Sequence, residues 1–173
     1  MTPQHIFLIG PMGAGKTTIG RHLADLLGLS FIDVDAEIES RAGADIQWIF
    51  DMEGEQGFRD RETKVLNDLV SGTPPRVIAT GGGIILNADN RAVLQCSGLV
   101  IYLSATAEQL IERTRRDKTR PLLQVDDREA VIRKLVEERG PLYSQVADLV
   151  FPSGSTQPLR LAKNLAEAVS TRG

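Results

Sequence analysis

The residues Gly10-Pro11-Met12-Gly13-Ala14-Gly15-Lys16-Thr17 stand between a short apolar run, 5–9, and a segment, 16–27, whose apolar side chains recur at a helical spacing. They match the pattern G-x-x-x-x-G-K-[ST], in which glycines let successive backbone N–H groups turn toward one anion. The helix that follows adds partial positive charge at its N-terminus. A strand, a tight loop and a helix in this order predict a phosphate-binding loop.

Short apolar segments alternate with helical ones along the rest of the chain. Predicted strands cover 5–9, 31–32, 77–79, 99–103 and 149–151, and predicted helices cover 16–27, 36–41, a short helix with 46–50, 55–70, 107–115 and 159–169. Parallel strands need crossover connections, which are usually helices. We therefore expect an α/β fold of three α/β/α layers around a five-stranded parallel sheet, as one domain over 1–173.

Composition excludes several classes of protein. The chain carries 20 basic and 23 acidic residues, for a formal net charge of -3, and 42% of its residues are hydrophobic. A general nucleic-acid-binding surface is therefore not expected, and no apolar run approaches the ~20 residues that a membrane-spanning helix needs. We expect a soluble, cytoplasmic protein. Cys96 is the single cysteine, so an internal disulfide is impossible, and we expect its thiol to be buried or half-buried.

Polar and glycine-rich segments follow four of the predicted strands. They are the loop 10–17, the pair Asp33 and Asp35, the glycine triplet 81–83, and the segment 153–158. Ligands of parallel sheets bind at the carboxyl ends of the strands, which meet at one edge. The four segments therefore predict a single site.

The phosphate loop indicates a nucleotide but not its use. Lys16 can reach the β- and γ-phosphates, and the Thr17 hydroxyl can take one position on Mg²⁺. Residues 51–54 match the D-x-x-G pattern of GTPases, but they lie between helical segments and no N-K-x-D motif occurs. A GTPase is therefore not favoured.

Asp33 and Asp35 have two interpretations. Asp35 stands just before the predicted helix 36–41 and can serve as its N-cap, which explains only one of the two. Near a Mg²⁺–nucleotide, one carboxylate can order the waters of the metal while another accepts the proton of an attacking alcohol. The triplet 81–83 is likewise either a flexible turn or a place where a small polar ligand approaches the backbone.

Arginine is over-represented among the basic residues, with 15 arginines to 5 lysines. This excess has two alternative interpretations, codon bias or a requirement for anion recognition. Five basic residues fall within 113–120. This run is either a solvated helix end or a mobile lid that closes over a triphosphate.

Taken together, these residues resemble the shikimate kinase family, small phosphate-loop kinases of the nucleoside-monophosphate-kinase type. The resemblance runs from about residue 6 to 158. It includes the loop through Thr18, then Phe31-x-Asp33-x-Asp35-x-x-Ile38-Glu39, Ile49-Phe50-x-x-x-Gly54-Glu55-x-x-Phe58-Arg59-x-x-Glu62, the triplet after Ala79-Thr80, Arg113-Thr114-x-x-Asp117-x-x-Arg120-Pro121-Leu122-Leu123, and Arg139-x-x-Leu142-Tyr143. It implies a monomer that uses ATP and Mg²⁺ to phosphorylate the 3-hydroxyl of shikimate, on the route to chorismate and the aromatic amino acids.

The resemblance also implies roles for residues on the acceptor side, in a substrate-binding region of about 33–62 and beyond. Asp35 holds the acceptor hydroxyls and is the candidate base. Gly81, Gly82 and Gly83 border the acceptor, with backbone donors from Gly82. Arg59 and Arg139 clamp the carboxylate, in keeping with the paired hydrogen bonds that guanidinium groups make, and Glu62 fixes Arg59.

On the nucleotide side, the resemblance implies that Thr17 binds the metal and that Asp33 lies in its outer shell. Lys16 and Arg120 act on the transferring phosphoryl group, with Arg120 reaching in from a lid of about 113–125. Arg113 packs on the adenine, and we place Gln157 on the same side. The expected nucleotide-binding set is Gly13, Ala14, Gly15, Lys16, Thr17, Thr18, Arg113, Arg120 and Gln157.

Two other functions stay open. A kinase for another small molecule, such as gluconate, would share Lys16 and Thr17 but not the pair Arg59 and Arg139. A kinase-like module that binds nucleotide without turnover would lack Asp35 or Arg120, and both residues are present.

Overall fold

The computed structural model describes residues 4–71, 74–115, 126–154 and 156–172. A parallel sheet of five strands, in the order β2-β3-β1-β4-β5, forms its centre. The strands are β1 (His5–Ile9), β2 (Ser30–Asp33), β3 (Arg76–Ala79), β4 (Gly98–Ser104) and β5 (Leu149–Pro152). The helices are α1 (Lys16–Leu27), α2 (Val34–Ala42), α3 (Ile46–Val70), α4 (Ala88–Ser97), α5 (Ala107–Thr114), α6 (Arg128–Val146) and α7 (Pro158–Arg172), with a 3-10 helix, η1 (Ile84–Leu86).

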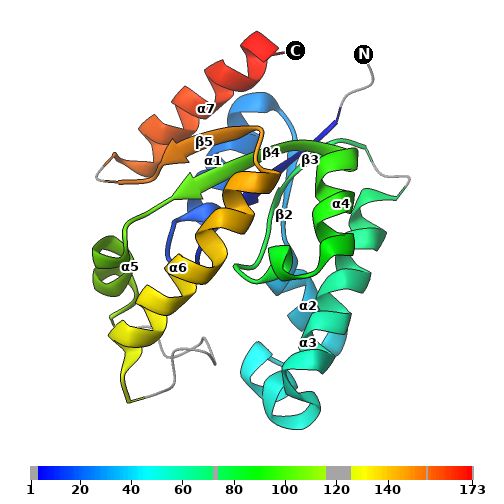
Figure 1. The fold of residues 1–173 in the computed structure, drawn as a ribbon. Coiled ribbons are helices and arrows are strands. Elements are labelled where there is room, and N and C mark those ends of the chain that lie inside the picture. Colours follow the sequence, from blue (N-terminus) through cyan, green and yellow to red (C-terminus); the bar gives the residue numbers. More distant parts are fainter. Residues whose placement is uncertain (1–3, 72–73, 116–125, 155, 173) are drawn as a thin grey trace.

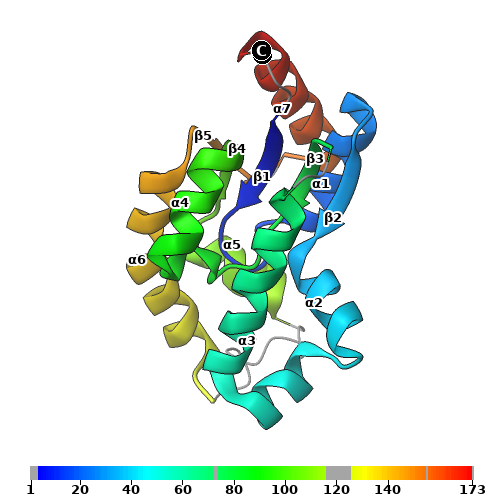
Figure 2. The same ribbon diagram turned by 90° about the vertical axis from the view of Figure 1, so that its right-hand side faces the viewer.

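Helices cover both faces of the sheet, so the predicted three-layer α/β/α architecture is confirmed (Figures 1 and 2). Helices α1 and α7 pack on one face with Ile6 and Leu8 of β1, and α3, α4 and α6 pack on the other with Phe7 and Ile9. Because β1 is covered on both faces, it is apolar at nearly every position instead of alternating.

The sheet register brings the predicted ligand-binding segments to one edge. Leu8 of β1 and Asp33 of β2 both pair with Ala79 of β3, so the three strands end at the same level. The segments that follow these strands, which begin at Gly10, Val34 and Thr80, therefore leave the sheet side by side. This confirms the expected placement of three of the four segments.

Helix α2 begins earlier than predicted. Strand β2 runs directly into it, and Asp33 is the N-cap, with Oδ1 accepting a hydrogen bond from the backbone N–H of Ala36 at 3.0 Å. The prediction of Asp35 as the N-cap is therefore wrong, because that residue already lies in the first turn. Capping explains Asp33 and leaves Asp35 without that role.

Helix α3 consists of two helical segments that meet at Gly54, whose φ of 74° and ψ of 178° are not helical. The first begins as predicted, with Asp45 as N-cap accepting from the Trp48 N–H at 2.8 Å. Arg61 pairs with Glu53 across the break, through two contacts of 2.8 Å. The break lets the first segment turn away from the axis of the second.

Several local features differ from expectation. Helices α4 and α6 are not among the predicted elements, and α6 contains Pro141, a residue that usually argues against a helix. Cys96 is exposed, so the prediction of a buried or half-buried thiol is wrong. Helix α4 buries Asn90 and Leu94, and a residue two positions beyond Leu94 points to nearly the opposite side of a helix.

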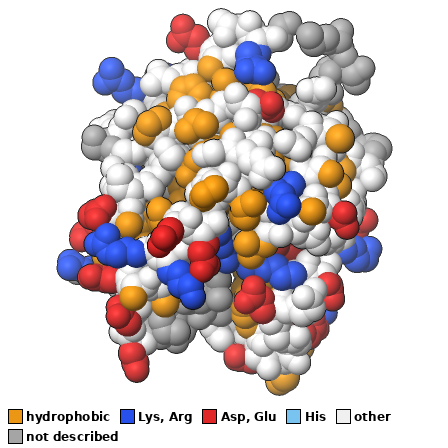
Figure 3. Space-filling model, viewed as in Figure 1, with side chains coloured by type: hydrophobic (Ala, Val, Ile, Leu, Met, Phe, Trp, Pro, Cys, Tyr) orange, Lys and Arg blue, Asp and Glu red, His pale blue; other side chains and the backbone are white. Residues whose placement is uncertain are grey.

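The charged side chains do not form a surface of one sign. On the face shown in Figure 3, basic and acidic side chains are interspersed over the lower part of the molecule. Several are paired, including Arg41 with Glu37 and Asp68, which ties α2 to α3. Among the described helices, none is both long and apolar enough to cross a membrane.

Candidate active site

The phosphate loop joins β1 to α1, and its shape depends on glycine. Gly10, Gly13 and Gly15 have φ values of 146°, 85° and 93°, in a region that other residues rarely adopt. At Gly10 a side chain is also excluded by space, since its Cβ would lie 2.5 Å from the carbonyl oxygen of Leu103. Gly15 is the N-cap of α1. The unpaired N–H groups of that helix end therefore belong to the loop, which suits an anion.

Lys16 is buried at the base of this loop. Its Nζ donates to the carbonyl oxygens of Gly10 at 2.7 Å and Pro11 at 2.8 Å. These two contacts hold the ammonium group beside the loop that supplies the backbone donors. A phosphate in the loop would meet both the backbone N–H groups and this positive charge.

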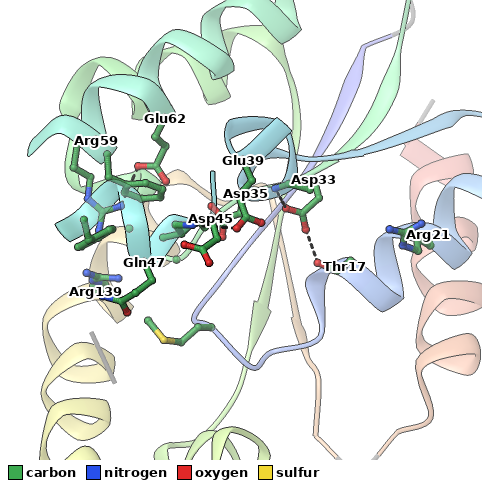
Figure 4. Close-up of a pocket in the computed structure, with 18 residues that line it drawn as sticks. Thr17, Arg21, Asp33, Asp35, Glu39, Asp45, Gln47, Arg59, Glu62 and Arg139 are labelled. Carbon is green, nitrogen blue, oxygen red and sulfur yellow. Dashed lines mark hydrogen bonds and ion pairs between the residues drawn. The ribbon is translucent and has the colours of Figure 1, made fainter. Parts of the chain in front are cut away.

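Thr17 and Asp33 form the part of the site with metal-binding chemistry. The Thr17 hydroxyl donates to Oδ2 of Asp33 at 2.5 Å, while the other carboxylate oxygen caps α2 (Figure 4). A hydroxyl and a carboxylate are the hard oxygen groups that Mg²⁺ prefers. Among the described residues, no group of three or more His, Cys, Asp or Glu could hold a metal.

A cavity of about 630 Å³ opens between the phosphate loop, α2, α3 and α6. It brings together most of the residues predicted for the acceptor and the metal. In Figure 4 the pair Thr17 and Asp33 lies toward one end, Arg59 and Arg139 lie toward the other, and Asp35 stands between them. The full lining is Met12, Thr17, Arg21, Asp33, Asp35, Ala36, Glu39, Asp45, Ile46, Gln47, Phe50, Phe58, Arg59, Glu62, Gly81, Gly82, Gly83 and Arg139.

Arg59 is held in place on several sides. Its Nη1 donates to Glu62 Oε1 at 3.0 Å, and its Nε donates to Glu55 Oε2 at 3.4 Å. Its guanidinium carbon lies 5.2 Å from the centre of the Phe58 ring. A Cβ on Gly83 would lie 2.4 Å from Nη2 of Arg59, so the guanidinium rests directly on the glycine backbone. The structure thus places Glu62 where the sequence analysis expected a fixing contact.

Glu62 is fully buried, and its electrostatic setting is unusual. Burial raises the pKa of its carboxyl group to about 7, and the charge of Asp35 adds to this, while Arg59 and Arg139 oppose it. A Cβ on Gly81 would lie 2.9 Å from Asp35 Oδ1 and 3.0 Å from Glu62 Oε2. The triplet therefore passes between the two carboxyl groups, where only glycine leaves them enough room.

Arg139 reaches the same end of the cavity from α6. It is buried, and a Cβ on Gly82 would lie 3.6 Å from its Nη1. The acceptor end therefore gathers two guanidinium groups, a glycine backbone and two carboxyl groups. A small ligand that carries both a carboxylate and hydroxyl groups matches this set of partners.

Arg113 links the phosphate loop to the segment after β5. Its guanidinium donates to Gly13 O at 3.2 Å, to the hydroxyl and carbonyl oxygens of Ser153 at 3.0 and 3.2 Å, and to Gly154 O at 2.5 Å. The segment 153–158 therefore reaches the loop through this arginine. Gln157 is exposed and does not line the cavity. Arg120 and most of the expected lid lie outside the described residues.

Several cavity residues lie in the expected region of about 33–62 but were not predicted individually as site residues. Ile46, Gln47 and Phe50, from the first segment of α3, form part of the wall. Glu39 Oε2 accepts from the Ile46 N–H at 3.0 Å and so anchors this segment to α2. The spacing of Ile46 and Phe50, one helical turn apart, was the available signal, but it equally describes packing against the core.

Comparisons with known proteins agree on one family. The family model described as "Shikimate kinase" matches residues 12–170. A shikimate kinase of Histophilus somni is 52% identical over 167 residues, which cover 96% of this chain and 95% of the relative. A shikimate kinase of Pseudoalteromonas atlantica is also 52% identical, covering 96% of this chain and 97% of the relative.

Solved structures give the same result. The structure described as "Shikimate kinase from Acinetobacter baumannii in complex with shikimate" superposes with a TM-score of 0.95 at 49% identity, covering 99% of this chain and 95% of that one. A gluconokinase from Sinorhizobium meliloti has a TM-score of 0.57 at 16% identity, covering 99% of this chain and 98% of that one, which shows a shared fold alone.

Proposed function

The chain belongs to the shikimate kinase family, and we propose from this that it transfers the γ-phosphoryl group of ATP to the 3-hydroxyl group of shikimate. The products are ADP and shikimate 3-phosphate, on the route to chorismate and the aromatic amino acids. One observation carries the proposal at the level of residues. A single cavity has metal-binding chemistry beside the phosphate loop at one end and two guanidinium groups at the other.

The phosphate loop binds the β- and γ-phosphates of ATP in this proposal. The residues that hold them are Gly13, Ala14, Gly15, Lys16, Thr17 and Thr18. The position of Lys16 supports this role, because its ammonium group is already fixed against the loop by two carbonyl oxygens. During transfer, that charge opposes the negative charge that develops on the phosphoryl oxygens.

Thr17 and Asp33 are the residues that would hold Mg²⁺, Thr17 through its hydroxyl and Asp33 through the water shell of the metal. When bound there, the ion would offset the negative charge of the phosphate groups. The 2.5 Å contact between the two side chains supports the pairing, since it places both oxygen groups at one point. Asp33 keeps its second oxygen on the N-terminus of α2, which fixes the orientation of the carboxylate.

The acceptor binds at the other end of the cavity. Arg59 and Arg139 clamp the carboxylate of shikimate, and guanidinium groups suit this because they form two parallel hydrogen bonds with a carboxylate. Asp35 holds the hydroxyl groups and takes the proton of the 3-hydroxyl as it attacks. Its place between the arginine pair and the phosphate loop supports that role (Figure 4). Gly82, flanked by Gly81 and Gly83, adds backbone donors.

The remaining assignments concern the nucleotide and its cover. Arg113 packs on the adenine, and its contacts with Gly13 and Gly154 support a position at the nucleotide side. Gln157 lies on that side too. Arg120 reaches the phosphates from a lid of about 113–125, whose closure excludes water and limits ATP hydrolysis. The proposal further includes a single-domain monomer in the cytoplasm, with no nucleic-acid or membrane partner.

The other two functions find less support. The gluconokinase likeness is limited to the fold, whereas the relatives at about half identity over nearly the whole chain are shikimate kinases. A module without turnover would not need Asp35, which lines the cavity between the arginine pair and the phosphate loop.

The test is a coupled assay of ADP release with ATP and Mg²⁺, run with shikimate, with gluconate and with no acceptor. We expect rapid release with shikimate only, and phosphorus NMR of the product should show a phosphate ester at the 3-position. Release that is stimulated by gluconate and not by shikimate would overturn the proposal, and so would release that no acceptor changes.

A further inference from the structure

The glycine triplet forms a tight turn whose central peptide has two possible orientations. The Ile84 N–H donates to the Gly81 carbonyl oxygen at 3.3 Å, which closes a four-residue turn over 81–84. Gly83, at the third position, has φ -96° and ψ 5°. These angles are those of a type I turn. The central peptide joins Gly82 to Gly83, and its carbonyl and N–H groups point in opposite directions.

Nothing within the turn itself fixes this orientation. Rotating the central peptide by about 180° gives a type II turn, which needs positive φ at the third position, and glycine reaches positive φ at no steric cost. A side chain at Gly83 would prevent this rotation, because residues other than glycine rarely adopt positive φ. No side chain fits there, since its Cβ would lie 2.4 Å from Nη2 of Arg59. The close contact with Arg59 therefore requires glycine at position 83, and glycine leaves the central peptide free to rotate.

Tyr143 of α6 supplies the missing constraint. Its hydroxyl donates to the Gly82 carbonyl oxygen at 2.5 Å, a contact between residues 61 positions apart. The Tyr143 side chain is only 1% exposed, so its hydroxyl is held in a buried position. Burial raises the pKa of the hydroxyl well above its ordinary value, so the group stays a donor at any working pH.

The same hydroxyl lies close to Arg139 and to the phosphate loop. A Cβ on Gly82 would lie 3.5 Å from Tyr143 Oη, 3.6 Å from Arg139 Nη1 and 3.4 Å from the backbone nitrogen of Met12. Arg139 and Tyr143 are one helical turn apart on α6, so they face the same way. The peptide, the guanidinium group and the phosphate loop therefore pack around one point.

We propose that Tyr143 is a positioning residue that holds the Gly82–Gly83 peptide in one turn orientation, so that the acceptor meets a fixed arrangement of backbone and arginine groups. Without the hydroxyl, the peptide rotates, and the Gly82 carbonyl and Gly83 N–H exchange directions. Only molecules with the competent orientation then bind the acceptor, so the apparent affinity falls in proportion to the fraction of such molecules. The inference rests on the proposed function and adds a residue to which that proposal gives no role.

The experiment compares Tyr143→Phe with Tyr102→Phe. The two rings pack with centroids 5.0 Å apart and a tilt of 31°, but among the described residues the Tyr102 hydroxyl makes no hydrogen bond. Each variant removes one hydroxyl from the same ring pair, and only the first frees Gly82. We expect Tyr143→Phe to raise the KM and Kd for shikimate about tenfold, as for a lost buried hydrogen bond, with the KM for ATP within about twofold. Tyr102→Phe should match the wild type.

A second measurement reports the turn without reference to activity. The backbone N–H signals of Gly82 and Gly83 in ¹⁵N NMR should be single and sharp in the wild type and in Tyr102→Phe, and broadened or doubled in Tyr143→Phe. A Tyr143→Phe protein with wild-type KM for shikimate and unchanged glycine signals would overturn the inference, even if its melting temperature fell. If the wild type shows no shikimate-dependent ADP release, the proposed function fails instead, and the NMR comparison alone decides on the turn.

Discussion

The two ends of the cavity are built in different ways. The phosphate-binding part of the nucleotide end comes from eight consecutive residues, 10–17, and its lysine is held by the loop's own carbonyl oxygens. The acceptor end combines Asp35 of α2, Arg59 of α3, the triplet 81–83 and Arg139 of α6. One end is therefore a local structure and the other a product of tertiary packing.

This difference separates two kinds of sensitivity. A backbone cradle depends on the conformation of a few glycines and on one helix end, so changes at the acceptor end should leave phosphate binding intact. The acceptor end depends on contacts between distant elements, such as Arg59 with Glu62 and Tyr143 with Gly82. Substitutions there should change acceptor kinetics while the nucleotide constants stay as they are.

The largest expected effect that separates the two ends comes from Asp35→Asn. Loss of a general base lowers kcat by about 10²- to 10⁴-fold. The KM for ATP should stay near the wild-type value, because the variant leaves unchanged the glycines of the phosphate loop and the two contacts that hold Lys16 in place. Steady-state kinetics with varied ATP and varied shikimate provide the measurement.

Asp45→Asn is the matched control for that change. Asp45 lines the same cavity and loses the same charge, and asparagine still caps a helix. Full kcat in Asp35→Asn would remove the base assignment. An equal loss in both variants would show that the charge of the cavity matters more than the position of Asp35.

A smaller effect is expected from Arg139→Lys, which tests the acceptor end through its α6 contribution. Lysine keeps the charge but loses the paired hydrogen bonds of the guanidinium group. The KM for shikimate should rise about 10- to 100-fold, as for one or two charge-assisted hydrogen bonds, with little change in the KM for ATP.

Arg133→Lys serves as its control, because Arg133 is exposed on the same helix and pairs with Glu108 at 2.8 Å, a contact that lysine can also make. An unchanged KM for shikimate in Arg139→Lys would argue against the clamp. A rise of the KM for shikimate in both variants would indicate that substitutions in α6 disturb acceptor binding regardless of their position.

The smallest expected effect concerns stability, and it arises from the buried carboxyl group of Glu62 at the acceptor end. The pKa of Glu62 is about 7 in the folded protein against 4.5 for the ordinary group. The folded state therefore prefers the protonated form, so this contribution to stability is fully present below pH 4.5 and is lost as the pH rises through 7. Between these values, the unfolding free energy of the wild type should fall relative to that of Glu62→Gln by up to about 3 kcal/mol.

Urea unfolding of both proteins at several pH values measures this difference. The pKa of His5 is lowered by burial, which makes stability fall as the pH drops below 6.5, but His5 is present in both proteins and cancels in the comparison. Glu55→Gln is the control, since it removes the exposed partner of Arg59 and should keep the wild-type pH profile. A constant difference between wild type and Glu62→Gln across pH 4.5–8 would contradict the assigned environment of Glu62.

The sequence predicts the local end of the cavity better than the assembled end. Residues 5–9 and 16–27 form the predicted strand and helix with the same bounds, because apolar periodicity and glycine chemistry act over a few residues. The N-cap of α2 was misplaced from Asp33 to Asp35, since a strand that runs directly into a helix leaves no loop residues to mark the boundary.

Contacts between distant residues give no local signal. Nothing in the sequence around Tyr143 indicates its bond to Gly82, and α6, which contains Pro141, was not predicted at all. The resemblance to a family supplied Arg59 and Arg139 as a pair, whereas the residues alone look like ordinary surface arginines. The contact of Arg59 with Gly83 explains the triplet only once the fold is known.

The central proposal is that the two ends of the cavity serve a single transfer, to an acceptor held by its carboxylate. The most direct measurement is the rate of ADP release with shikimate against its methyl ester, which keeps the hydroxyl groups and removes the charge. The account predicts rapid release with shikimate and at least about a tenfold loss of kcat/KM with the ester, from charge-assisted hydrogen bonds to Arg59 and Arg139. Equal rates with the two acceptors, or no release with either, would contradict it.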